Sequence, residues 1–199
     1  DLLTWWFDHH HSAFLTPDDE NHFKNDTSGK KFLDTNSKSC CEYIAKIAKE
    51  QFGYESGHLK NLVEWAHIID GALYESPAQC VELQSSALKL MQLIENEKDV
   101  SVVEEIIKSL GRHSIDEILL DPFIAERLEP ILERHWEVVE LVKQRAVFDR
   151  GVVSFDLTDT DVDSYNKFIP YYFFPETTDR KSTRLNSSHS SVSRMPSSA

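Results

Sequence analysis

The stretch Leu2-Leu3-Thr4-Trp5-Trp6-Phe7-Asp8-His9-His10-His11-Ser12-Ala13-Phe14 decides the expected fold, because an uncharged apolar run leads directly into an acid and three imidazoles. Leu2 to Phe7 are apolar or β-favouring and predict a strand buried on both faces, as in a parallel sheet covered by helices. Asp8 to His11 then follow its carboxyl end, the edge at which α/β sheets bind ligands. Imidazole and carboxylate together suit a divalent metal. The alternative is a solvated polar loop after an edge strand.

The composition is that of a folded chain of ordinary domain size, with 199 residues, 40% of them hydrophobic and 11% aromatic. A formal net charge of −13 argues against a broad electrostatic grip on nucleic acid, so a polyanionic substrate would need local cations such as bound metal. No apolar run is long enough to span a membrane, and no secretory signal opens the chain. We therefore expect a cytoplasmic protein with no membrane partner.

The cysteines Cys40, Cys41 and Cys80 are odd in number and lack C-x-x-C spacing. They are predicted to be free thiols in a reducing compartment, with Cys40 and Cys41 packing in a helix.

Both ends of the chain suggest that it is a fragment. The chain opens without Met at a strand, and because a lone parallel strand cannot bury both faces, its sheet neighbours are expected upstream. Residues 179–189 and 193–199 match, in one reading frame, the translated constant parts of a common sequencing adapter, with residues 190–192 where its variable index would fall. We therefore expect residues 179–199 to be a non-native tail outside the fold. The alternative, a natural Ser-rich disordered tail, has the same structural consequence.

After the histidines, residues 15–38 are polar and predict a long loop, either a functional lid or a surface insertion. Ser37 or Ser39 then caps a helix that reaches Phe52 and stops at Gly53. The start of this helix offers backbone N–H groups to a phosphate, although capping alone explains the serines.

A second helix follows Gly57 and is apolar over more than half its circumference, so it is expected to be buried. It ends at Asp70-Gly71, where an acid sits beside a glycine that lets a ligand approach. This makes Asp70 a second candidate site residue. The alternative is an exposed terminal residue, for which Asp is poorly suited because the helix dipole is negative there.

Further helices are predicted from Pro77 to about residue 94 and over residues 100–110. Asp121-Pro122 begins a long amphipathic helix, about 45 Å long if it continues to Arg150, which Pro130 should bend unless it starts a new helix. A strand over residues 151–157 and an aromatic stretch over residues 169–175 follow. The many carboxylates of these helices are expected to be solvated.

Asp8-His9-His10 resembles the signature of the DHH superfamily of phosphoesterases, and Ser12-Ala13-Phe14 fits it too. The stretch from Ala66 to Pro77 resembles the fourth motif of that family, in which an apolar segment delivers a metal-binding Asp and is followed by an aromatic residue and Ser-Pro. Gly71 departs from it, because many members have Thr there. The likeness is to RecJ-like and oligoribonuclease-like members.

The resemblance implies an α/β fold, here the helix-rich C-terminal part of a parallel-sheet domain, with a linker helix and the start of a second domain. The expected organisation is a partial DHH domain over 1–120, a long linker helix over 121–150, a truncated second domain over 151–178 and the adapter-derived tail over 179–199. The clustered-Asp motif expected upstream and the GGGH motif expected downstream are missing from this chain.

The resemblance also implies a hydrolase with two metal ions, usually manganese, that cleaves phosphodiester or phosphoanhydride bonds. By that likeness His9 and Asp70 ligate one ion, His10 is catalytic through phosphate contact or proton transfer, and Asp8 orients an imidazole. His11 has no assigned role and is expected to be exposed. Since the remaining ligands are missing, the chain alone is expected to be inactive.

The expected substrate is a phosphorylated small molecule or short nucleic acid, which leaves oligonucleotide, cyclic dinucleotide and polyphosphate open, as well as the oligomeric state. The rival interpretation is a non-catalytic, acidic helical interaction module in which residues 8–11 are surface. Metal titration separates the two.

Overall fold

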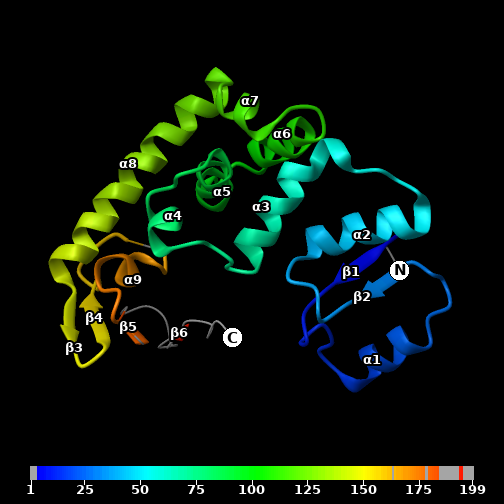
Figure 1. Ribbon diagram of the computed structural model, residues 1–199, viewed down its shortest axis with the longest axis horizontal. Coiled ribbons are helices and arrows are strands. Elements are labelled where there is room, and N and C mark those ends of the chain that lie inside the picture. The colour runs from blue at the N-terminus through cyan, green and yellow to red at the C-terminus, as the bar shows by residue number, and fades with distance from the viewer. Residues whose placement is uncertain (1–3, 163, 178, 184–192, 195–199) are drawn as a thin grey trace. The chain divides into compact units, whose positions relative to one another are not determined.

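The computed structural model describes residues 4–162, 164–177, 179–183 and 193–194. The chain divides into two compact units, Asp1–Tyr74 and Glu75–Ala199, whose elements are labelled in Figure 1. The family layout places its first boundary at residue 120 instead, and that layout stays a prediction. The chain as a whole has a mixed α/β fold that is rich in helices.

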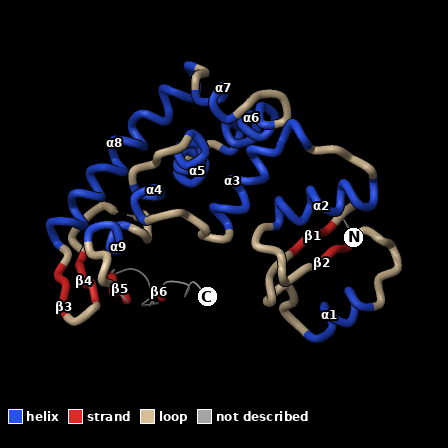
Figure 2. The backbone as a smooth tube through the Cα atoms, in the orientation of Figure 1, coloured by secondary structure: helices blue, strands red, loops and turns tan. Residues whose placement is uncertain are grey.

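The first unit places a small parallel sheet between helices. Its elements are β1 (Trp6–Asp8), α1 (Pro17–Lys24), β2 (Lys31–Leu33), α2 (Cys40–Phe52), the single-turn helix η1 (Gly57–Leu59) and α3 (Lys60–Asp70). The strands β1 and β2 pair in parallel, with Phe7 opposite Phe32. Figure 2 shows α2 and α1 on opposite sides of this pair.

Aromatic side chains alternate across β1, as the period of a strand requires. Phe7 stacks on Phe32 with 4.9 Å between ring centroids and meets Tyr43 of α2 edge-on. Trp6 points the other way and contacts Phe23 of α1. Neighbouring residues of β1 therefore point to opposite faces of the sheet, Phe7 toward α2 and Trp6 toward α1.

A strand forms where the apolar run ends, but it covers Trp6–Asp8 and leaves Thr4 and Trp5 of the predicted stretch outside it. The predicted burial on both faces is wrong, because Trp6, Phe7 and Asp8 remain partly exposed. Among the described residues β1 pairs with one strand, β2, and a sheet of two strands is too narrow to bury its residues fully. Leu2 and Leu3, which the predicted strand included, lie outside the described residues.

The prediction of a long loop over residues 15–38 is also wrong, since this stretch holds both α1 and β2. Thr16 and Asp19 form a capping box, in which the Thr16 hydroxyl accepts from the Asp19 N–H at 3.2 Å and the Asp19 carboxylate accepts from the Thr16 N–H at 2.9 Å. Pro17 occupies the first helical position, where its missing N–H costs nothing. These local signals outweigh the polarity of the segment.

Helix α2 has the predicted bounds. The Ser39 hydroxyl accepts from the Glu42 N–H at 3.0 Å, and Gly53 ends the helix with a left-handed φ of 64°. Tyr43 and Ile47 of α2 pack on the sheet residue Phe32. Helix α3 ends at Asp70 as predicted, but none of its residues is fully buried. The expectation of a buried helix is therefore wrong, because within its unit α3 packs mainly along α2.

The second unit is mostly helical. Its elements are α4 (Pro77–Val81), α5 (Ser86–Asn96), α6 (Val100–Leu110), α7 (Ile115–Leu119), α8 (Pro122–Arg145), β3 (Val147–Asp149), β4 (Val152–Asp156), α9 (Ile169–Phe173), β5 (Asp179–Thr183) and β6 (Ser193–Arg194). Helix α6 has the predicted bounds. The single helix predicted from Pro77 is wrong, because it breaks into α4 and α5, where Leu83 takes a φ of 51° and the Ser85 hydroxyl caps the second helix.

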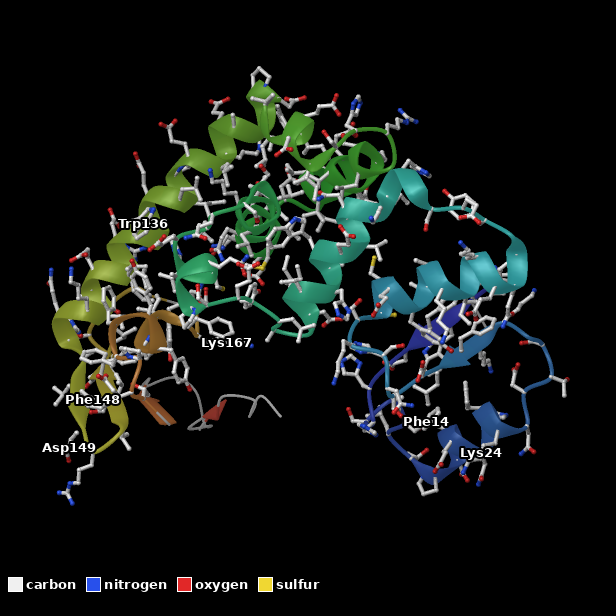
Figure 3. The ribbon with its side chains drawn as sticks, in the orientation of Figure 1. Phe14, Lys24, Trp136, Phe148, Asp149 and Lys167 are labelled. Carbon is white, nitrogen blue, oxygen red and sulfur yellow. The ribbon has the colours of Figure 1, made fainter. Side chains whose placement is uncertain are left out.

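The long helix α8 begins as predicted and ends at Arg145 instead of Arg150, so its 24 residues span about 36 Å at ~1.5 Å per residue. Pro130 lies inside it and does not start a new helix. The end of the predicted linker helix forms β3 instead, which pairs antiparallel with β4. Figure 3 shows Phe148 and Asp149 on this hairpin, and the Phe148 ring stacks on Phe174 at 5.7 Å.

Apolar residues from α4, α8, β4 and α9 share one core. Its buried members are Val81, Val138, Val139, Val142, Val153, Phe155, Leu157, Val162 and Ile169. The aromatic stretch after residue 168 forms α9 and is buried at its start, as its composition required. Residues expected to begin a separate domain thus pack against the linker helix in one compact unit.

Residues 179–183, expected to lie outside the fold, form β5 and pair in parallel with β4. Whether this segment is adapter-derived stays a prediction, and most of the rest of the tail lies outside the described residues. The three cysteines are free thiols, as predicted. In the part of the chain that the structure describes, no helix combines the length and apolarity needed to cross a membrane.

Candidate metal centre

Asp8 ends β1 by accepting hydrogen bonds from the residues that follow it. One oxygen, Oδ1, accepts from the backbone N–H of His9 at 2.7 Å and of His10 at 3.0 Å, and it also lies 2.7 Å from His10 Nδ1. Burial would raise the pKa of Asp8, but the hydrogen bonds from the His10 backbone and ring and from the His9 backbone hold it below its ordinary value. An ionised carboxylate only accepts, so His10 Nδ1 carries the proton in this contact.

His9 is held by a different group. Its Nδ1 lies 3.2 Å from the carbonyl oxygen of Ser37, in the loop after β2. Because a carbonyl oxygen only accepts, Nδ1 must carry a proton, and in the neutral ring the lone pair then belongs to Nε2. The side chain of His9 is only 11% exposed, so its direction is set by its surroundings.

Asp70, the last residue of α3, lies opposite this lone pair. Its Oδ2 is 3.4 Å from His9 Nε2, and its side chain is 45% exposed. A Cβ on the next residue, Gly71, would come within 2.9 Å of the His67 carbonyl oxygen, so the helix closes more tightly there than a side chain allows. The structure brings His9 and Asp70 together, as the sequence pattern predicts, and their role as ligands stays a prediction.

The pair fits two ligands of one divalent cation. In the neutral tautomer an imidazole lone pair and a carboxylate oxygen, both acceptors, face each other and require a proton or a cation between them. Two ligand atoms that each lie ~2.1 Å from one metal ion at a tetrahedral angle are ~3.4 Å apart. Among the described residues, no third His, Cys, Asp or Glu joins them in a group able to hold a metal ion.

The other two histidines differ in their surroundings. The ring of His10 lies beside that of His9, with 4.2 Å between centroids, and is 63% exposed. It is therefore accessible to a substrate, while Asp8 holds its Nδ1. His11 is exposed, as predicted.

Sequence reasoning missed two carboxylates, one joined to Asp8 and one joined to a histidine on the helix that carries Asp70. Asp34 directly follows β2, and its backbone N–H donates to the carbonyl oxygen of Asp8, the last residue of β1, at 3.2 Å. Glu42 of α2 has its Oε2 2.7 Å from Nδ1 of His67, an ion-pair contact without the alignment of a hydrogen bond. Two features of the sequence could have pointed to these contacts. Asp34 ends a short apolar run, and His67 lies three residues before Asp70, on the same face of the helix.

Cys40 and Cys41 are the first two residues of α2, and the charges of Asp8 and Asp70 act on their thiols. Burial and the charges of Asp8 and Asp70 raise the pKa of Cys40, and burial and Asp70 raise that of Cys41. Both cysteines are therefore protonated at neutral pH and weak as nucleophiles or metal ligands on their own.

A scan against protein-family models gives no match, and a search of the curated proteins gives none. Among solved structures, the pGpG-specific phosphodiesterase PggH from Vibrio cholerae matches with a TM-score of 0.68 at 20% sequence identity. The fold resembles that of a phosphodiesterase. The match covers 91% of this chain and 58% of that one, so this chain spans little more than half the length of the structure it resembles. At this identity the likeness concerns the fold, and membership of the DHH superfamily stays a prediction.

Proposed function

We propose that this chain is part of a metal-dependent phosphoesterase of the DHH type. The observation that carries the proposal is the approach of His9 Nε2 to Asp70 Oδ2, at 3.4 Å, beyond the carboxyl end of a parallel strand. Ligands of α/β proteins bind at that edge. The likeness of the fold to a phosphodiesterase supports the same conclusion.

In this proposal His9 and Asp70 hold one of two divalent ions, manganese by the family resemblance. Such an ion, when bound, neutralises phosphate charge and lowers the pKa of bound water. Asp8 keeps a proton on Nδ1 of His10, which leaves Nε2 of this exposed ring to contact a phosphate oxygen or carry a proton. His11 has no part in it.

The proposed substrate is a phosphorylated small molecule or a short nucleic acid. Oligonucleotides, cyclic dinucleotides and polyphosphate all suit a metal centre that compensates the formal charge of −13. Because PggH is described as pGpG-specific, a linear dinucleotide is the first substrate to assay.

Manganese binding tests the proposal directly. We expect the full chain to bind Mn²⁺ in a calorimetric titration, and His9→Ala or Asp70→Asn to weaken binding by more than about tenfold, because each removes one of two ligands. His11→Ala, an exposed neighbour of the pair, serves as the matched control and should bind like the parent.

Equal binding by all four proteins, or by none, would contradict a shared cation at His9 and Asp70. The second result would favour the non-catalytic interaction module.

A further inference from the structure

The loop that holds His9 is anchored at both ends. At its start, the Asp34 N–H donates to the carbonyl oxygen of Asp8, which joins the end of β2 to the end of β1. At its far end, Ser39 is fully buried and caps α2. The carbonyl of Ser37, which accepts from His9 Nδ1, lies between these two fixed points.

The side chain of Asp34 determines the path of this loop. Its Oδ1 accepts from the Asn36 N–H at 3.0 Å, and its Oδ2 accepts from the Ser37 hydroxyl at 3.0 Å. The Ser37 N–H in turn donates to the Asp34 carbonyl oxygen at 3.1 Å. An Asp that bonds the backbone two residues ahead forms a compact local turn.

An ionised carboxylate accepts both hydrogen bonds, and the pKa of Asp34 agrees with that state. The Asn36 N–H and the Ser37 hydroxyl hold the pKa of Asp34 below its ordinary value of 3.8. At neutral pH Asp34 therefore acts only as an acceptor, which is the role that the turn needs.

We propose that Asp34 is a positioning residue for His9: it directs the Ser37 carbonyl at Nδ1 and so turns the Nε2 lone pair toward Asp70. The path runs from Asp34 through Ser37 to His9, with a hydrogen bond at each step. A backbone carbonyl that fixes the tautomer of a metal-binding imidazole raises metal affinity, so the consequence for manganese rests on the proposed function.

The chain contains a matched control. Asp26 forms a turn of the same kind in the loop before β2, where its carboxylate accepts from the Ser28 N–H at 2.9 Å. It also pairs with Lys31 at 2.9 Å, and none of its hydrogen bonds or ion pairs involves His9. Asp26→Ala therefore removes a turn-forming carboxylate without touching the path to His9.

The test reads the tautomer of His9 by ¹⁵N NMR of the imidazoles in the metal-free full chain, with His9→Ala used to assign its signals. We expect the Nδ1–H form in the parent and in Asp26→Ala, and a mixture of both forms in Asp34→Ala. Asp34→Asn should lie between them, since an amide oxygen can still accept from the Asn36 N–H. Mn²⁺ affinity should fall by about tenfold in Asp34→Ala.

An unchanged Nδ1–H form in Asp34→Ala, or a parent already in the Nε2–H form, would overturn the proposal. If Asp34→Ala fails to fold, Asp34→Asn carries the same decision. A tautomer change without Mn²⁺ binding in the parent would support the positioning role and contradict the proposed function, so the two failures are distinguishable.

Discussion

At the end of β1 two neighbouring imidazoles are held by different partners. His10 is fixed by the charged Asp8, whereas His9 is fixed by the neutral carbonyl of Ser37. Because a carbonyl oxygen and an ionised carboxylate only accept, both contacts place the proton on Nδ1 and leave Nε2 of each neutral ring with the lone pair.

At this scale we predict that Asp8→Asn lowers Mn²⁺ affinity by about tenfold, and less than His9→Ala does, because it removes a nearby charge and keeps the ligands. Calorimetric titration of the two variants measures the difference. Equal affinity of Asp8→Asn and the parent would remove the proposed role of Asp8.

The pH dependence of Asp8 has a defined sign. The pKa of its folded-state carboxyl lies below the ordinary value of 3.8. Its ionised form therefore adds stability that is complete above that value and is lost as the pH falls through the lowered pKa. The contact between Asp8 and His10 accordingly persists throughout the neutral range.

Among the elements, α3 matters because its last residue supplies Asp70. The contact between His67 of α3 and Glu42 of α2 ties the helix to the element beside β1. Both side chains are partly exposed, at 31% and 47%, so solvent screening limits their contribution to stability to less than about 1 kcal/mol. Its energetic contribution is therefore small, and its effect on the position of Asp70 is a prediction.

We predict that Glu42→Gln weakens Mn²⁺ binding several-fold while it changes the free energy of unfolding by less than about 1 kcal/mol. Glu64→Gln is the control, because Glu64 forms an exposed ion pair with Lys60 within α3 itself, at 3.6 Å. Denaturant unfolding and metal titration of both variants provide the two measurements. Equal affinities of the two variants would show that the tie to α2 does not position Asp70.

For the whole molecule, the proposed two-metal mechanism needs more ligands than the described residues bring together in one group. A two-metal mechanism needs two ions about 3.5 to 4 Å apart. His9 and Asp70 offer two ligands for one of them, and no larger group of ligands occurs among the described residues. The chain also spans 58% of the phosphodiesterase that it resembles.

We predict that the full chain with excess Mn²⁺ does not hydrolyse pGpG, a generic phosphodiester or a short oligonucleotide. The reason is that binding and charge neutralisation both depend on groups beyond this pair. Product release, followed by chromatography, measures turnover. Metal-dependent turnover that disappears in His9→Ala would show that the chain is complete enough to work.

Local signals allowed several elements to be predicted from the sequence alone. The apolar run before Asp8 predicted a strand, Ser39 and Gly53 set the bounds of α2, and the apolar period after Gly57 predicted that α3 ends at Asp70. Each of these signals lies within a few residues of the feature that it determines. The capping box at Thr16 was equally local, but the polarity of its surroundings concealed it.

The sequence by itself therefore determined which chemical groups stand at the ends of β1 and α3, because strand and helix ends depend on neighbouring residues. Only the tertiary structure decided that Ser37, 28 residues away, holds Nδ1 of His9 and that Nε2 consequently faces Asp70. Burial also depended on the tertiary structure, because the sequence predicted that β1 and α3 are buried and both remain partly exposed. The direction of a side chain and its burial depend on what packs around it, and residues remote in the chain supply those neighbours.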